Sequence, residues 1–179
     1  MYTINEENQV KYNIIVLIIL TASCLLISCI SNKISTPEQA LSAYIEAYKN
    51  GNCNVLYDLN LNLNKTIQSR ESYCEQFSSS RSPVLKWIVS KMTYKIENIE
   101  NNGDTTKIKF ITKRPDLSST PQIWDKLIPE NESEAKSIIQ ELERLYNQNM
   151  IKNVETNLQY DLVETDKGWK ISNFHTRSI

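Results

Sequence analysis

The chain has 179 residues, of which 40% are apolar and 23% are charged, so it is long enough for one domain with its own hydrophobic core. Glu6, Glu7 and Lys11 are the charged residues that precede Cys29, which leaves 19 basic and 19 acidic residues after it. This balance argues against a nucleic-acid binder, which needs a basic face to displace counterions from phosphates.

The N-terminal segment holds an uncharged apolar run from Ile14 to Ile27. Its length is typical of the apolar part of a signal peptide and is short for a membrane span. The run ends in Leu26-Ile27-Ser28-Cys29, which resembles the lipobox of bacterial lipoproteins: a leucine three residues before the cysteine and a small residue just before it. The resemblance implies that residues 1–28 are a signal peptide and that Cys29 carries the lipid.

Apart from a buried core helix, which is a lesser possibility, the alternative is an uncleaved anchor helix over about residues 14–30. In both cases the chain after residue 31 lies outside the cytoplasm, because Lys11 stays on the inner side. We therefore expect attachment to the cell membrane or the outer membrane, with residues 29–35 as a tether.

The first helix of the folded part is predicted after this tether. Thr36 is a suitable N-cap, Pro37 fits the first helical position, and Gln39 can complete a capping box. Asn50-Gly51 ends the helix. One face at helical spacing is apolar and comprises Ala40, Leu41, Tyr44, Ile45 and Tyr48.

Residues 53–64 allow two interpretations, because a helical first half is followed by a strand-like alternation of Leu and Asn. Short helices are predicted over 71–77 and 83–91, the second capped by Ser82, with a turn between them. Cys53 and Cys74 form an even pair in the exported part, which favours a disulfide; two buried free thiols are the alternative.

Two hairpins are predicted farther along the chain. Residues 92–99 and 105–112 alternate around a turn at 101–104, with Met92, Tyr94 and Ile96 on one face. Residues 155–164 and 169–175 form the second, joined by Asp166-Lys167-Gly168. Between the hairpins, the segment 114–131 holds three prolines and one expected helical turn at 123–127, and a helix follows over 131–148.

This order predicts an α+β fold over residues 36–179, with helices packed on a curved antiparallel sheet of about four strands and a helix inserted between two hairpins. The opening helix from Thr36 to Ile45 with its stop at Asn50-Gly51, and the closing segment from Asp166 to Ile171, resemble the nuclear transport factor 2-like superfamily. The resemblance covers residues 36–176 and implies a cone-shaped domain that encloses a pocket. In enzymes of that superfamily an aspartate, sometimes with a histidine, acts as the base inside the pocket.

Candidate catalytic residues are few. His175 is the single histidine, and Asp161 on the neighbouring strand is its one candidate partner. Tyr57-Asp58 are residue types that could act on a carbonyl substrate, although a buried tyrosine beside a solvated aspartate is the simpler interpretation. No spacing of His, Cys, Asp or Glu suggests a metal site, and no glycine-rich loop suggests a nucleotide or other cofactor.

Trp124 lies in the proline-bearing segment and is the candidate residue for contact with a ligand or partner, although packing in the core or in the loop is the favoured interpretation. The function expected is that of a membrane-anchored extracytoplasmic lipoprotein, non-catalytic, that binds an envelope protein or a small apolar ligand. One alternative is a small isomerase- or dehydratase-like enzyme that uses Asp58 or Asp161. The other is an inhibitor or immunity lipoprotein of the cell envelope.

Overall fold

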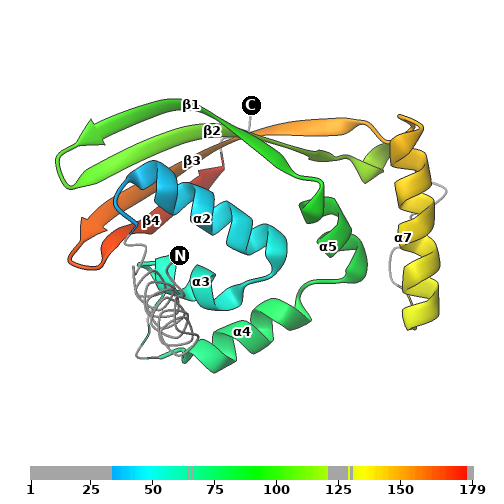
Figure 1. The fold of residues 1–179 in the computed structure, drawn as a ribbon, viewed down its shortest axis with the longest axis horizontal. Helices are drawn as coiled ribbons and strands as arrows, with labels where there is room; N and C mark the ends of the chain where they lie inside the picture. Colours follow the sequence, from blue (N-terminus) through cyan, green and yellow to red (C-terminus); the bar gives the residue numbers. More distant parts are fainter. Residues whose placement is uncertain (1–33, 64, 66, 121–128, 130, 177–179) are drawn as a thin grey trace, which may run out of the picture. The chain divides into compact units, whose positions relative to one another are not determined.

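The structure is a computed structural model, and it describes residues 34–63, 65, 67–120, 129 and 131–176. The described elements follow one another in the order expected from the sequence, with the labels of Figure 1. They are α2 (Pro37–Asn50), α3 (Cys53–Leu59), α4 (Arg70–Ser79), α5 (Pro83–Ser90), β1 (Thr93–Asn102), β2 (Thr105–Pro115), the 3₁₀ turn η1 (Leu117–Ser119), α7 (Glu132–Asn147), β3 (Asn153–Thr165) and β4 (Gly168–Thr176).

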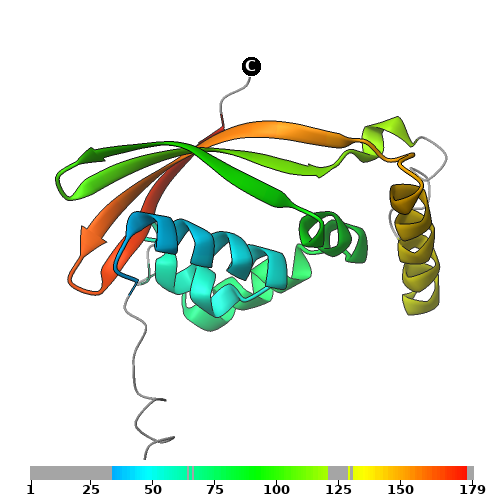
Figure 2. The same cartoon turned by 45° about the horizontal axis from the view of Figure 1, so that its top comes forward.

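The four strands form one antiparallel sheet in the order β1-β2-β3-β4. In Figures 1 and 2 the sheet curves over α2, α3 and α4, so that these helices cover its concave side. Helix α7 is inserted between β2 and β3 and stands at the end of the sheet near α5. The predicted α+β class, with an inserted helix between two hairpins, is confirmed.

The first helix forms as its local sequence predicts. The Thr36 side chain accepts a hydrogen bond from the Gln39 amide at 3.2 Å, and Gly51 ends α2 in the left-handed region at φ 74°. The capping box differs in detail, because the Gln39 side chain accepts a hydrogen bond from the Ser35 amide and not from Thr36. The reach of the side chain thus extends one residue beyond the cap.

Of the two interpretations of residues 53–64, the helical one is correct for the first half. Helix α3 ends at Leu59, and Asn60 then forms an isolated bridge with Ile171 of β4; next to it the Leu61 amide donates to the Ile171 oxygen at 2.8 Å and the Asn62 side chain donates to Asn173 at 2.9 Å. The alternation of Leu and Asn therefore does not form a strand over residues 60–63, because these residues make one isolated bridge to β4 and no continuous strand pairing.

The strands of the two hairpins run longer than predicted. The segment expected to leave the sheet at Arg114 continues β2 to Pro115, because Arg114 pairs with Val154 and Pro115 with Asn153. A bulge between Ile96 and Asn98 shifts the register of β1, which leaves Ile96 and Ile99 both packed against the core.

Two hydrophobic clusters hold these elements. The first joins α2 to the concave face of the sheet and includes the fully buried residues Leu41, Ile108 and Leu162. The second joins α5, η1 and α7 and comprises Val84, Trp87, Leu117, Ile138, Leu142, Leu145 and Ile151. Helix α7 thus packs on α5 and not under the sheet. Within the described residues, no helix is both long enough and apolar enough to span a membrane.

Candidate functional site

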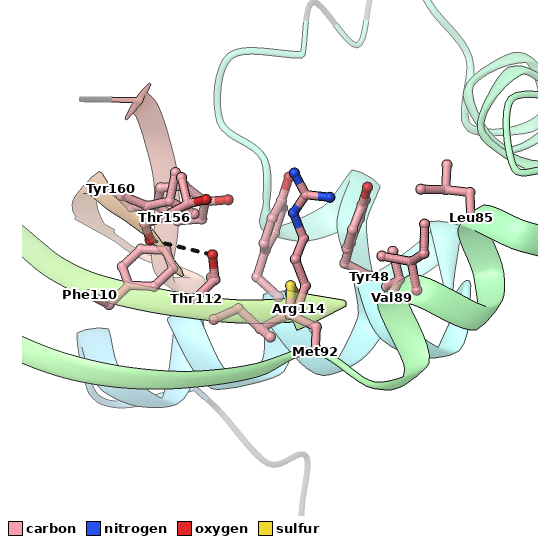
Figure 3. A pocket seen from close by; sticks show the side chains of 13 residues that line it. Tyr48, Leu85, Val89, Met92, Phe110, Thr112, Arg114, Thr156 and Tyr160 are labelled. Carbon is pink, nitrogen blue, oxygen red and sulfur yellow. Dashed lines mark hydrogen bonds between the residues drawn. The ribbon is translucent and has the colours of Figure 1, made fainter. Parts of the chain in front are cut away.

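A cavity of about 380 Å³ lies between the concave face of the sheet and helices α2 and α5, and we call it the sheet cavity (Figure 3). Its described lining is mostly aromatic and aliphatic, with two threonines and one arginine. The lining residues are Tyr44, Ile45, Tyr48, Leu85, Ile88, Val89, Met92, Phe110, Thr112, Arg114, Thr156, Leu158 and Tyr160. A volume of this size is within the range of small-molecule sites.

The periodicities of the helix and of the strands place these side chains on the faces that line the cavity. Tyr44 and Tyr48 are four residues apart and lie on one face of α2. On the sheet every second residue faces the helices, which selects residues 110, 112 and 114 of β2 and residues 156, 158 and 160 of β3. The register places Phe110 opposite Leu158 and Thr112 opposite Thr156. The cavity therefore needs the pairing of β2 with β3, which belong to different hairpins, and the helix above both strands.

Aromatic rings form one wall of the sheet cavity. The ring of Tyr160 meets Tyr44 edge to face, with centroids 5.7 Å apart, and meets Phe110 in the same way at 4.9 Å. Thr112 donates a hydrogen bond to the main-chain oxygen of Thr156 at 3.4 Å, which Figure 3 shows as a dashed line. These contacts fix the wall by packing and leave few polar atoms to orient a ligand.

The buried tyrosine hydroxyls are held in their neutral form. Burial raises the pKa of Tyr160 to about 12, with a smaller contribution from Tyr48. Burial also raises the pKa of Tyr44 well above its ordinary value, and the neighbouring tyrosines add to the shift. At neutral pH both side chains can exchange hydrogen bonds with a ligand, but neither offers a negative charge.

Arg114 supplies the one formal charge among the described lining residues. It lies near the end of β2, and in Figure 3 its side chain stands between those of Thr112 and Tyr48. It is exposed to solvent and takes part in none of the ion pairs of the described residues. The sheet cavity therefore combines an apolar interior with one exposed cation, which forms no ion pair among the described residues and interacts electrostatically with Asp116, two residues along the chain.

The aspartates singled out from the sequence do not line the sheet cavity. Asp58 accepts two hydrogen bonds from Arg70, at 2.7 and 2.9 Å, and half of its side-chain surface is exposed. Tyr57 is buried and donates to the main-chain oxygen of Gln68. The buried Tyr57 and the half-exposed Asp58 agree with the simpler interpretation of this pair.

Asp161 follows Tyr160 on β3 and so faces the opposite side of the strand, where it accepts a hydrogen bond from Gln159. On β4, the main chain of His175 pairs with that of Gln159 on β3. The side chain of His175 is not among those that the structure describes. Trp124 and Cys29 are likewise outside the described residues. Among the residues described, no group of three or more His, Cys, Asp or Glu side chains could hold a metal ion.

The predicted disulfide between Cys53 and Cys74 is confirmed. It joins the start of α3 to α4, with a sequence separation of 21 residues. Closing a loop of this size stabilises the folded chain by about 3 kcal/mol in the chain-entropy model. Neither cysteine lines the sheet cavity.

The sequence analysis missed the cavity residues Arg114, Thr112 and Thr156. A local signal was present, because residues 106–112 alternate between buried side chains and more exposed ones. Extending that alternation by one step would have placed Arg114 on the core-facing side of β2. Arg81, which is buried beside the end of α2, was also missed, since nothing in its neighbourhood of serines distinguishes it from an exposed arginine.

No family model matches the sequence, and no curated protein is significantly similar to it. Several solved structures share the arrangement of elements at low identity. One from Thiobacillus denitrificans, assigned as a calcium/calmodulin-dependent protein kinase type II association domain, is 9% identical, with 82% of this chain and 97% of that chain covered and a TM-score of 0.47.

A SEC-C motif containing protein from Rhodopseudomonas palustris is 7% identical, with 80% of each chain covered and a TM-score of 0.44. An NTF-2 like protein of unknown function from Shewanella oneidensis is 9% identical, with 78% of this chain and 94% of that chain covered and a TM-score of 0.45. All three scores are below 0.5, and neither the family nor the activity of this chain follows from them.

Proposed function

We propose that this chain is a membrane-anchored lipoprotein whose nuclear transport factor 2-like domain binds a small apolar ligand with an acidic group in the sheet cavity. The observation that carries the proposal is the composition of the cavity, an apolar and aromatic interior of about 380 Å³ with Arg114 as its single charge among the described lining residues. The anchor is supported by the lipobox at Leu26–Cys29.

The ligand class follows from the chemistry of the walls. Tyr44, Tyr160 and Phe110 present ring surface, which favours flat or aliphatic molecules over sugars and nucleotides. An acidic group on such a molecule would pair with Arg114, whereas a cationic group would be repelled by it. A neutral tyrosine hydroxyl can donate to, or accept from, a carbonyl or carboxylate in the same ligand.

Binding is favoured over turnover by the same wall. General acid–base catalysis needs a side chain that holds or releases a proton near neutral pH, within hydrogen-bond reach of the substrate. The described lining offers neither Asp, Glu, His nor Cys, and the pKa of Tyr160 is about 12. Asp58 and Asp161, the two candidate bases, lie elsewhere, so the enzyme alternative has no support from their placement.

The proposal is tested with 8-anilinonaphthalene-1-sulfonate, a flat apolar fluorophore that carries one sulfonate. Fluorescence of the probe should rise on saturable binding to the natively folded full chain. Leu158→Trp fills the sheet cavity and should weaken binding by at least about tenfold, because the tryptophan occupies the space of the probe. Asn157→Trp adds the same ring on the other face of β3 and should leave binding unchanged.

Arg114→Gln tests the acidic group. Loss of the cation should weaken binding of the sulfonate probe about tenfold, the usual value of a charge-assisted hydrogen bond. Lys113→Gln removes the same charge from the adjacent, outward-facing position, where Lys113 pairs with Glu155 at 3.5 Å, and is the matched control. The sheet cavity would be ruled out as the site if the unchanged chain, Leu158→Trp and Asn157→Trp all bound the probe with equal affinity. Native circular dichroism of each protein would show that all three are folded.

A further inference from the structure

A second cavity, of about 450 Å³, lies at the C-terminal end of α2, and we call it the arginine cavity. It shares no lining residue with the sheet cavity. Its described lining is polar and includes three basic side chains and no acidic one. The lining residues are Lys49, Asn50, Gly51, Phe77, Ser78, Arg81, Lys86 and Ser90.

Arg81 is the centre of this cavity and is 7% exposed. Its guanidinium lies over the rings of Tyr48 and Phe77, at 5.5 and 5.1 Å from their centroids. One of its terminal nitrogens, Nη2, donates to the main-chain oxygen of Lys49 at 3.2 Å, near the end of α2. The two rings and the negative end of the helix hold the guanidinium in place.

The charge of Arg81 is not matched by a carboxylate. Arg81 takes part in no ion pair of the described residues, and its Nε atom is buried without a hydrogen-bond partner. A buried cation without a counter-charge costs free energy, and buried guanidinium groups ordinarily meet a carboxylate or a phosphate. The described part of the chain supplies no carboxylate to Arg81, and the cavity beside it is large enough for an anion.

The surroundings of Arg81 favour an anion with several oxygens. A Cβ atom on Gly51 would come within 2.8 Å of the Arg81 Nη1 atom, so the glycine lets this nitrogen lie against the main chain at the end of α2, in the wall of the cavity. Lys86 lines the same cavity, is exposed and has no ion-pair partner in the described part of the chain. Lys49 is a third cation there, although it also pairs with Glu46 at 3.3 Å. A planar fork and two point charges suit the three or four oxygens of a phosphate group.

We propose that the arginine cavity binds a phosphate group, with Arg81 as the fixed donor and Lys86 as the mobile one. The proposal is independent of the apolar ligand of the sheet cavity. Phosphate as a free ion, as a soluble ester or as a lipid headgroup presents the same oxygens, and the probes below separate these sources.

The test is isothermal titration of the full chain, in an uncharged detergent, with inorganic phosphate and with glycerol phosphate, ionic strength being held constant with sodium chloride. Saturable binding above that of chloride is expected. Lys86→Gln should weaken it about tenfold, because a charge-assisted contact is lost from an exposed position that does not support the fold. Lys95→Gln, the same change at an exposed position on β1, should have no effect.

Arg81→Lys keeps the charge but loses the planar fork, and it should weaken phosphate binding more than Lys86→Gln does. Leu158→Trp should leave phosphate binding intact, which separates this site from the sheet cavity. Binding of short-chain phosphatidylglycerol without binding of the soluble phosphates would identify a lipid headgroup as the source. The proposal is overturned if none of the three phosphates binds better than chloride, or if Lys86→Gln and Lys95→Gln behave alike.

Discussion

At the scale of single residues, Tyr160 shows how burial at a cavity wall couples a side chain to the stability of the fold. Its hydroxyl ionises near pH 10 in an unfolded chain and at about 12 in the folded protein. The unfolded state therefore loses the proton first as the pH rises. The associated stability is complete below pH 10 and is lost between about pH 10 and 12.

We predict that Tyr160→Phe reduces the alkaline loss of stability. The free energy of unfolding of the unchanged chain should fall by about 1 kcal/mol more than that of the variant between about pH 8 and 11, because phenylalanine has no proton to lose. Urea unfolding at the two pH values measures the difference. The same pH dependence in both proteins would show that Tyr160 titrates as an exposed tyrosine.

Arg81 is a second residue that contributes to the stability of the fold. Its hydrogen bond to Lys49 and its contacts with Tyr48 and Phe77 tie the segment between α4 and α5 to the end of α2. A buried arginine in such a position serves the fold even when no anion is bound. For this reason Lys86, which is exposed, is the more informative position for testing the proposed phosphate site.

At the scale of elements, α7 is held by a hydrophobic cluster separate from that of the sheet. Leu142 is fully buried in the cluster that α7 shares with α5 and η1. An ion pair between Lys91 and Glu143, at 2.8 Å, adds a second link to the region before β1. Helix α7 can therefore open without breaking the pairing of β2 with β3.

We predict that Leu142→Ala opens α7 locally. The substitution leaves a cavity and should cost about 2–5 kcal/mol, so hydrogen exchange of α7 amides should accelerate by roughly 30-fold or more. Amides of β2 and β3 should change less. Gln140→Ala on the exposed side of α7 is the control and should leave exchange unchanged. An equal acceleration in helix and sheet would mean that the two clusters unfold together.

Elements with local signals could be predicted from the sequence. Thr36, Pro37 and Gly51 determine the ends of α2 by cap chemistry that involves only near neighbours. The turn at 101–104 and the one at 166–168 likewise contain their own signals. The end of β2 could not be predicted in this way, because Arg114 and Pro115 stay in the sheet only through partners almost forty residues later.

The candidate site was less predictable than the fold for the same reason. Tyr44 and Tyr48 were recognised as part of the apolar face of the first helix, since their helical spacing is regular. The role of Arg114 depends on the register between β2 and β3 and on the position of α2 above both strands. Neither the strand register nor the position of the helix can be predicted from the sequence pattern of a single segment.

At the scale of the whole molecule, the proposed lipid anchor decides where both cavities work. We predict that intact-mass analysis shows an acylated chain that begins at Cys29, and that Cys29→Ala abolishes this species, because the thioether forms only on the cysteine thiol. Cys24→Ala is the matched control and should leave acylation unchanged. A full-length, unmodified chain that begins at Met1 would contradict the anchor.

The contact of Gly168 with Ile34 has a consequence for the orientation of such an anchored domain. A Cβ atom on Gly168 would come within 2.6 Å of the Ile34 oxygen, so the main chain at Ile34 lies directly against the last turn of the sheet. An extended chain advances at most about 3.6 Å per residue, and five steps separate Cys29 from Ile34. Acylation at Cys29 would thus keep Ile34, and the turn beside it, within about 18 Å of the lipid surface. The length of this tether would limit how far the final hairpin turn rises above the bilayer, whichever way the domain is tilted.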